Sequence, residues 1–211
     1  MTASASLSVV PWRDIWVHPR STLRAVTAAG PNHRALIFSA GWGVVQSLFQ
    51  ASQNNVGLRA PLLWILVAAL VIGAIWGLLQ VFLLSGLVYI VGRWTDVVTT
   101  YYPVQTVFAW GTLPVAASLV LWLGAALILG RPLFLSDQAM AATGRPDLLI
   151  GVGVLYLVTG ALWIWSAVII VLGLAEIQRV SVLRALGIMI VGLVMFAVAA
   201  LLVLAFLMAA L

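Results

Sequence analysis

The densest group of polar side chains in the sequence lies between its last two apolar segments. Glu176 and Arg179 are three residues apart there, so on a helix they share a face and can form an ion pair. Glu176 adjoins an apolar segment without an intervening loop, and ionisable groups at membrane depth are candidates for function. Ion pairs at the level of the lipid headgroups are common, however, so a structural role is the favoured interpretation.

The sequence lacks the residue patterns that catalysis and metal binding require. It has no cysteine, which excludes disulfides, thiolate metal sites and thiol nucleophiles. Its two histidines, His18 and His33, stand apart from any carboxylate cluster and are interpreted as solvated helix caps. Neither a Gly-x-Ser-x-Gly elbow nor a Gly-Lys-Ser/Thr phosphate loop is present. We therefore expect no enzymatic activity, no cofactor and no bound metal.

The composition identifies the solvent that must surround these residues. Of 211 residues, 64% are hydrophobic and 7% are charged, whereas a soluble domain is roughly a quarter charged. The chain is therefore expected to be an integral membrane protein. Its net charge of +5 comes from arginines without any lysine, a usage typical of bacterial sequences. The arginines are scattered at segment ends, so anionic lipid rather than nucleic acid is the expected partner.

Charges and prolines divide the chain into a tail and a membrane domain. Residues 1–34 form the tail, and residues 35–211 are predicted to fold as an all-α polytopic membrane domain of five transmembrane helices: 35–51, 61–92, 105–130, 148–175 and 182–211. The first segment is short for the roughly 20 residues that cross a bilayer. The second exceeds one crossing and is expected to be tilted or kinked.

Arginine counting in the connections predicts the orientation, because cytoplasmic loops carry the excess of basic residues. Five spans place seven arginines on the amino-terminal side and three on the other: Arg13, Arg20, Arg24, Arg34, Arg93, Arg179 and Arg184 against Arg59, Arg131 and Arg145. The prediction is a bacterial inner-membrane protein with a cytoplasmic amino terminus and a periplasmic carboxyl terminus. Without the first span the partition is again seven to three, so the count leaves that span open.

The tail is predicted to hold a short amphipathic helix at the membrane interface. Pro11 suits the first position of a helix, and Trp12, Ile15 and Trp16 follow at spacings that place them on one face. An aromatic face with a basic flank anchors a helix among lipid headgroups. We expect these three side chains to insert into the cytoplasmic headgroup layer.

A stripe of small residues runs along the second apolar segment. Ala69, Gly73 and Gly77 are spaced four apart, which allows two helix backbones to approach closely in lipid. Packing against another helix of the same chain is the favoured interpretation, and a homodimer face is the alternative. Isoleucine at either glycine is expected to disrupt this contact, whereas alanine is expected to be tolerated.

Several short runs carry a resemblance to a known family: Trp12, Trp16 and His18-Pro19-Arg20; Phe108 to Pro114; and Trp165-Ser166 through Gly173 to Ser181 and Arg184-Ala185-Leu186. Together they resemble bacterial members of the Yip1 domain family over about residues 11–205. The resemblance implies five spans and a cytoplasmic amino terminus. Eukaryotic members act in vesicle traffic with Rab-type GTPases, but this sequence lacks their Asp-Leu-Tyr-Gly-Pro run and long amino-terminal region, which argues against GTPase binding.

Two functions from different classes are compatible with these residues. The favoured one is a non-catalytic scaffold, organising or accessory subunit that acts by helix packing with lipid, other integral membrane proteins or a second copy of itself. The alternative is a small transporter or channel-like protein, in which polar side chains hydrate a path between helices: Gln46, Gln50, Gln80, Ser85, Tyr89 and Thr159. The two functions differ in where these side chains point. A path requires that they converge on one continuous cavity, whereas a scaffold requires that each meets a neighbouring backbone.

Overall fold

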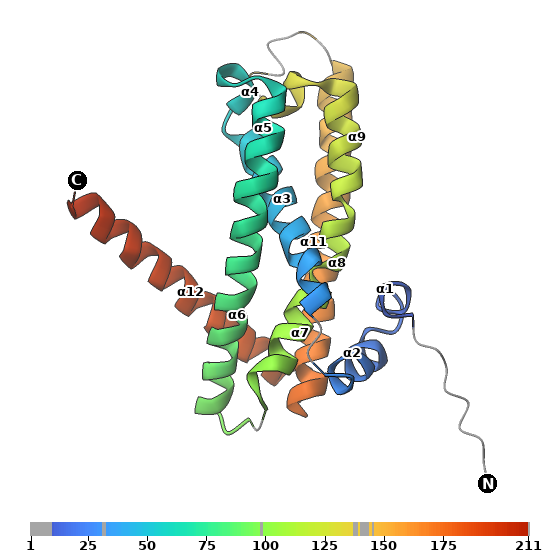
Figure 1. Ribbon diagram of the computed structural model, residues 1–211, viewed down its shortest axis with the longest axis vertical. Helices are drawn as coiled ribbons and strands as arrows, with labels where there is room; N and C mark the ends of the chain where they lie inside the picture. The colour runs from blue at the N-terminus through green and yellow to red at the C-terminus, as the bar shows by residue number, and fades with distance from the viewer. Residues whose placement is uncertain are drawn as a thin grey trace.

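The computed structural model describes residues 10–30, 33–97, 99–136, 139, 144 and 146–210, and every regular element among them is helical (Figure 1). The predicted all-α class is confirmed over this part of the chain. Arg145 and Leu211, which enter the predicted topology, lie outside it.

The amino-terminal segment forms two helices where one was expected. α1 (Pro11–Asp14) is a single turn, and α2 (Pro19–Ala28) has ten residues. Both begin at a proline, whose fixed φ and missing N–H suit the first position of a helix. α2 buries one face, formed by Pro19, Thr22, Leu23 and Val26. The longer amphipathic element is therefore α2, which follows the predicted aromatic face.

The membrane domain consists of long helices around a shorter central one. After a 3₁₀ turn at His33–Ala35, the chain forms α3 (Leu36–Gln53) and the short α4 (Val56–Arg59). One continuous helix follows, made of α5 (Leu62–Ala68), η2 (Ala69–Gly73) and α6 (Ala74–Trp94). Figure 1 shows α3 between this helix and the α9 and α11 side of the bundle. α3 contacts α6, η2, α7, α8 and α9.

The carboxyl-terminal half supplies three more long helical segments. α7 (Tyr101–Gly111), α8 (Leu113–Ala117) and α9 (Leu119–Leu129) form an interrupted helix, because Pro114 lacks the N–H that would continue the ladder. The 3₁₀ turn η3 (Arg131–Phe134) follows. α11 (Pro146–Gln178) runs back along the bundle, and α12 (Val182–Ala210) leaves it at an angle (Figure 1).

Within the part of the chain that the structure describes, four helices are long and apolar enough to span a membrane: Leu62–Trp94, Tyr101–Leu129, Pro146–Gln178 and Val182–Ala209. They correspond to the last four predicted spans, so the expected count of five is not confirmed. The first predicted span is α3, whose 18 residues include three glutamines. Its length of about 27 Å is just under the bilayer core of about 30 Å. α3 is therefore shorter and more polar than these four helices.

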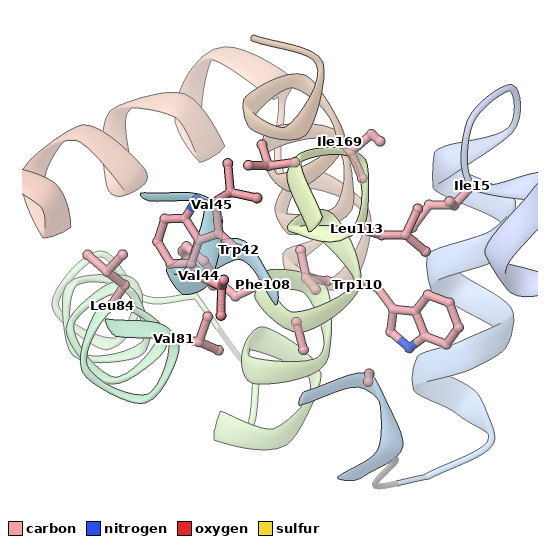
Figure 2. Packing of buried hydrophobic residues seen from close by; sticks show 14 of the residues in the cluster. Ile15, Trp42, Val44, Val45, Val81, Leu84, Phe108, Trp110, Leu113 and Ile169 are labelled. Carbon is pink, nitrogen blue, oxygen red and sulfur yellow. The ribbon is translucent and has the colours of Figure 1, made fainter. Parts of the chain in front are cut away.

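The core is built around α3. Val45 and Leu48 of α3 are 0% and 1% exposed, and Val81 of α6 is 0% exposed. Figure 2 shows Trp42, Val44 and Val45 among side chains from α6, α7, α8 and α11. The membrane-spanning helices keep apolar side chains on their outer surface, as lipid requires.

The crossing of α3 can be tested by labelling, because the chain has no cysteine of its own. We expect Asn54→Cys, just after α3, to react with an impermeant maleimide added outside the cell. Arg93→Cys, after the next span, should react only after permeabilisation. Both residues are exposed. The reverse pattern would show that α3 does not cross and that four spans carry the topology.

Candidate functional site

The small-residue stripe of the Leu62–Trp94 helix lies against α3 of the same chain. A Cβ built on Gly77 would stand 2.8 Å from both N and Cα of Gly43, and it would run into the carbonyl oxygen of Ser39. A Cβ on Gly73 would stand 2.8 Å from the carbonyl oxygen of Gly43. Gly43, Gly73 and Gly77 therefore form a seam, called here the glycine seam, in which the backbones of two helices touch.

The π turn η2 starts the stripe at Ala69, which is 5% exposed. On a regular α-helix, residues four apart drift around the axis by about 40°. A π turn takes more residues per turn and drifts in the opposite direction. The turn from Ala69 to Gly73 is π and the next is α, so the two drifts offset each other. The three small residues consequently stay on the face that meets α3.

These contacts revise the expectation for alanine. The atoms nearest to a Cβ on Gly77 belong to the α3 backbone, which has no rotamer by which to move aside. Alanine at Gly77 would therefore displace α3, so the expected tolerance of alanine does not fit this geometry. The partner glycine, Gly43, lies in the short first apolar segment, and the sequence analysis did not identify it as a packing residue. A glycine inside a transmembrane segment is a signal for close helix packing, but it does not identify the facing helix.

The polar turn after α11 holds α2 against the bundle. Glu176 pairs with Arg24 of α2, with 2.6 Å between Arg24 Nη2 and Glu176 Oε1. The expected partner, Arg179, is not the one that Glu176 takes. Arg179 has a φ of 53° just past the end of α11, so its backbone has left the helix on which a three-residue spacing would align the two side chains. The prediction of a Glu176–Arg179 pair was wrong.

Apolar packing reinforces this contact at the preceding residue of α2, Leu23, and about one turn earlier on α11, at Gly173. Leu23 is 0% exposed, and its Cδ1 occupies the space where a side chain on Gly173 would lie. A Cβ on Gly173 would also stand 2.8 Å from Val107 Cγ1 of α7. Because Arg24 is 70% exposed, its ion pair is screened and contributes at most about 1 kcal/mol. The buried Leu23 therefore contributes more to docking α2 than the ion pair does.

The three residues of the predicted interface anchor have different surroundings. Trp12 is 62% exposed and Trp16 is half-buried, and the Trp16 indole N–H donates to the Trp12 carbonyl oxygen at 3.1 Å. Ile15 is 0% exposed and belongs to the protein core (Figure 2). Ile15 therefore departs from the expectation that it inserts into the headgroup layer, because protein rather than lipid covers it.

The polar side chains proposed for a hydrated path have partners of different kinds. The Ser85 hydroxyl donates to the Val81 carbonyl oxygen at 2.6 Å, a contact within its own helix. Thr159 Oγ1 accepts from the Trp122 indole N–H at 3.2 Å. In contrast, Oε1 of Gln46 and of Gln80 is buried without a hydrogen-bond partner among the described residues.

The comparison with known families agrees with this helical layout. Residues 13–207 match the model of the Yip1 domain. The chain belongs to the Yip1 domain family. This confirms the resemblance carried by the tryptophan, Phe108–Pro114 and Trp165–Leu186 runs. No curated protein and no solved structure matches it.

The glycine seam of this Yip1 domain chain predicts that even an alanine side chain at Gly77 destabilises the fold. Gly77→Ala should lower the free energy of unfolding by about 1–3 kcal/mol, because its Cβ has no free space beside Gly43. The measurement is thermal or denaturant unfolding in detergent. Gly86→Ala is the matched control on the same helix, since the nearest atom to its Cβ is 4.0 Å away. There, alanine should stabilise by up to about 1 kcal/mol.

The same variants distinguish an internal seam from a dimer face. Gly77→Ile should reduce the folded yield equally at every protein dilution, because the facing backbone belongs to the same chain. A change confined to a monomer–dimer equilibrium would contradict the internal seam. Equal stability of Gly77→Ala and Gly86→Ala would show that α3 and α6 are not in contact at this point.

The docking of α2 predicts protection from protease. Leu23→Ser should expose Arg20 and Arg24 to trypsin, because the buried apolar contact with α11 and α7 would be lost. Glu176→Gln should have a much smaller effect, since the ion pair is screened. Val17→Ser is the control, as Val17 is already 73% exposed. Rapid cleavage of Glu176→Gln with protection of Leu23→Ser would reverse the ranking of the two contacts.

Proposed function

We propose that this Yip1 domain protein is a non-catalytic scaffold, organising or accessory subunit of a bacterial inner membrane. In this proposal, its amino terminus is cytoplasmic and its carboxyl terminus is periplasmic. It works by packing its helices against another integral membrane protein, a second copy or lipid. The single observation that carries the proposal is the exposure of α12.

α12 is attached to the bundle along its first part. Arg184 Nη2 donates to the Thr95 carbonyl oxygen, and Ala185 and Ile188 are 0% and 3% exposed. A Cβ on Gly192 would stand 2.9 Å from Val88 Cγ2 of α6. These contacts fix the direction in which α12 leaves α6 and α11, as Figure 1 shows.

Beyond this attachment, α12 extends without cover from its own chain. From residue 197 to residue 209 every described side chain is exposed, and this segment is called here the α12 arm. Only 6% of the most apolar stretch of α12 is buried, compared with 39% for Tyr101–Leu129. In lipid, apolar surface alone does not drive association, so partners are held by close packing of small residues. The α12 arm offers Ala205 and Ala209, spaced four apart.

The alternative is a small transporter or channel-like protein. The observation in its favour is the pair of buried glutamine oxygens without partners, on Gln46 and Gln80. Buried polar groups in membranes are usually hydrogen-bonded, and exceptions often border water or a ligand. Ser85 and Thr159 do not support the path in the same way, because their hydroxyls are already bonded within the protein.

The scaffold proposal predicts a specific protein neighbour along the α12 arm. A photoreactive amino acid at Leu202, which is 66% exposed, should form one discrete protein adduct in native membranes. The same amino acid at Leu157 of α11, which is 76% exposed, should label lipid alone. Ala205→Phe should abolish the Leu202 adduct by preventing close approach of a second helix.

Two outcomes would contradict a scaffold that binds another protein or a second copy of itself. Lipid adducts alone at both positions would show that the α12 arm faces only the bilayer. Release of a trapped small solute from liposomes containing the purified protein, reduced by Gln80→Leu, would instead support the transporter alternative. A Leu202 adduct with twice the mass of one chain would identify the neighbour as a second copy.

A further inference from the structure

An apolar groove of about 820 Å³ lies where α1 meets the membrane domain. Its lining includes Trp12 within α1 and Trp16 just after it. The other walls include Phe38 of α3, Leu70 of η2, Trp110 of α7 and Leu119 of α9. Its lining consists of Gly41 and of alanine, valine, leucine, isoleucine, phenylalanine and tryptophan residues. Its volume is within the range of small-molecule sites, roughly 300–1,000 Å³.

Small residues create the space between these aromatic walls. Ala40 and Gly41 of α3 and Ala116 and Ala117 of α8 all line the groove. A Cβ on Gly41 would stand 3.2 Å from the Cβ of Ala116, so the two helices nearly touch at its base. The walls hold their shape by mutual contacts, since the rings of Phe38 and Trp110 have centroids 5.2 Å apart.

The groove runs from the amino-terminal segment into the membrane-spanning part of the bundle. At one end it is bordered by Trp12 and Trp16, beside the end of the bundle where α2 docks. It is also lined by Leu70 and Leu119, which lie inside the candidate spans Leu62–Trp94 and Tyr101–Leu129. A lipid acyl chain likewise runs from the headgroups into the hydrocarbon core of the bilayer.

The charges at the α1 end favour an anionic headgroup. Arg13 follows the groove residue Trp12, and Arg34 precedes the groove residue Ile37 by three positions. Both arginines are exposed. Asp14, the residue after Arg13, accepts the backbone N–H of Val10 at 2.8 Å. Basic groups at the membrane surface attract anionic lipids.

We propose that this groove is a binding site for an anionic phospholipid. One acyl chain lies between Trp12, Trp16 and Trp110, and the headgroup lies beside Arg13 and Arg34. The site goes beyond the scaffold role and does not depend on it, because the α12 arm takes no part in the groove.

The test uses a phosphatidylglycerol probe with a photoreactive diazirine near the end of one acyl chain. The purified full-length protein is reconstituted in phosphatidylcholine vesicles with a trace of this probe and is irradiated. Adducts should concentrate on peptides that contain Trp16, Trp110 or Leu119. Ala117→Trp, which fills the groove from an exposed position, should reduce these adducts about ten-fold or more.

Ala161→Trp is the matched control, because Ala161 is exposed on α11 and does not line the groove. It should leave the groove adducts unchanged. Ala40→Phe provides a second filling variant from the opposite wall. Both filling variants are compared with wild type in thermal unfolding, so that lost labelling is assigned to the groove and not to misfolding. Groove adducts that persist in both filling variants would overturn the site.

Competition defines the headgroup. Unlabelled phosphatidylglycerol should displace the probe at a lower concentration than phosphatidylcholine with the same chains. The Arg13→Gln/Arg34→Gln double variant should abolish this difference. Equal competition by the two lipids in the wild-type protein, or equal competition by a free fatty acid, would overturn the assignment to an anionic phospholipid. Because α12 is unchanged throughout, neither result bears on the Leu202 adduct.

Discussion

The contact on which the bundle depends is the backbone-to-backbone approach of α3 to the Leu62–Trp94 helix. Lipid provides no hydrophobic drive for helices to associate, so α3 must be held by close packing. The glycine seam permits that distance, because a Cβ on either side would meet main-chain atoms of the other. With α3 fixed there, α7, α8 and α9 pack on its remaining sides. The apolar groove is in turn bounded by α3 and α8.

The long spans could be predicted from the sequence because each follows from local composition. Segments of more than 25 residues without charges permit few alternatives in a chain with 7% charged residues. α3 was harder to place, because its glutamines and glycines fit burial between helices better than contact with lipid. Its role depends on which helix faces it, and that information is not local.

The candidate contacts likewise divide into those that the local sequence predicts and those that depend on distant residues. The Ala69, Gly73 and Gly77 stripe was visible as a spacing, and only its facing helix had to come from the structure. The partner of Glu176 could not be predicted, because Arg24 is 152 residues away and Arg179 was the nearer base. Ile15 shared the period of Trp12 and Trp16, but α1 ends after one turn. A helical period over so few residues does not determine which side chains meet lipid.

The π turn at Ala69–Gly73 has a consequence for the register of the whole span. Such a turn contains one residue more than an α turn does, so it acts as a local insertion in the helix. Loss of one residue there would restore a regular helix and rotate everything beyond it by about 100° relative to α3. Gly77 would then leave the seam, and Gln80 would turn with it. Insertions and deletions are therefore constrained here more strictly than side-chain size.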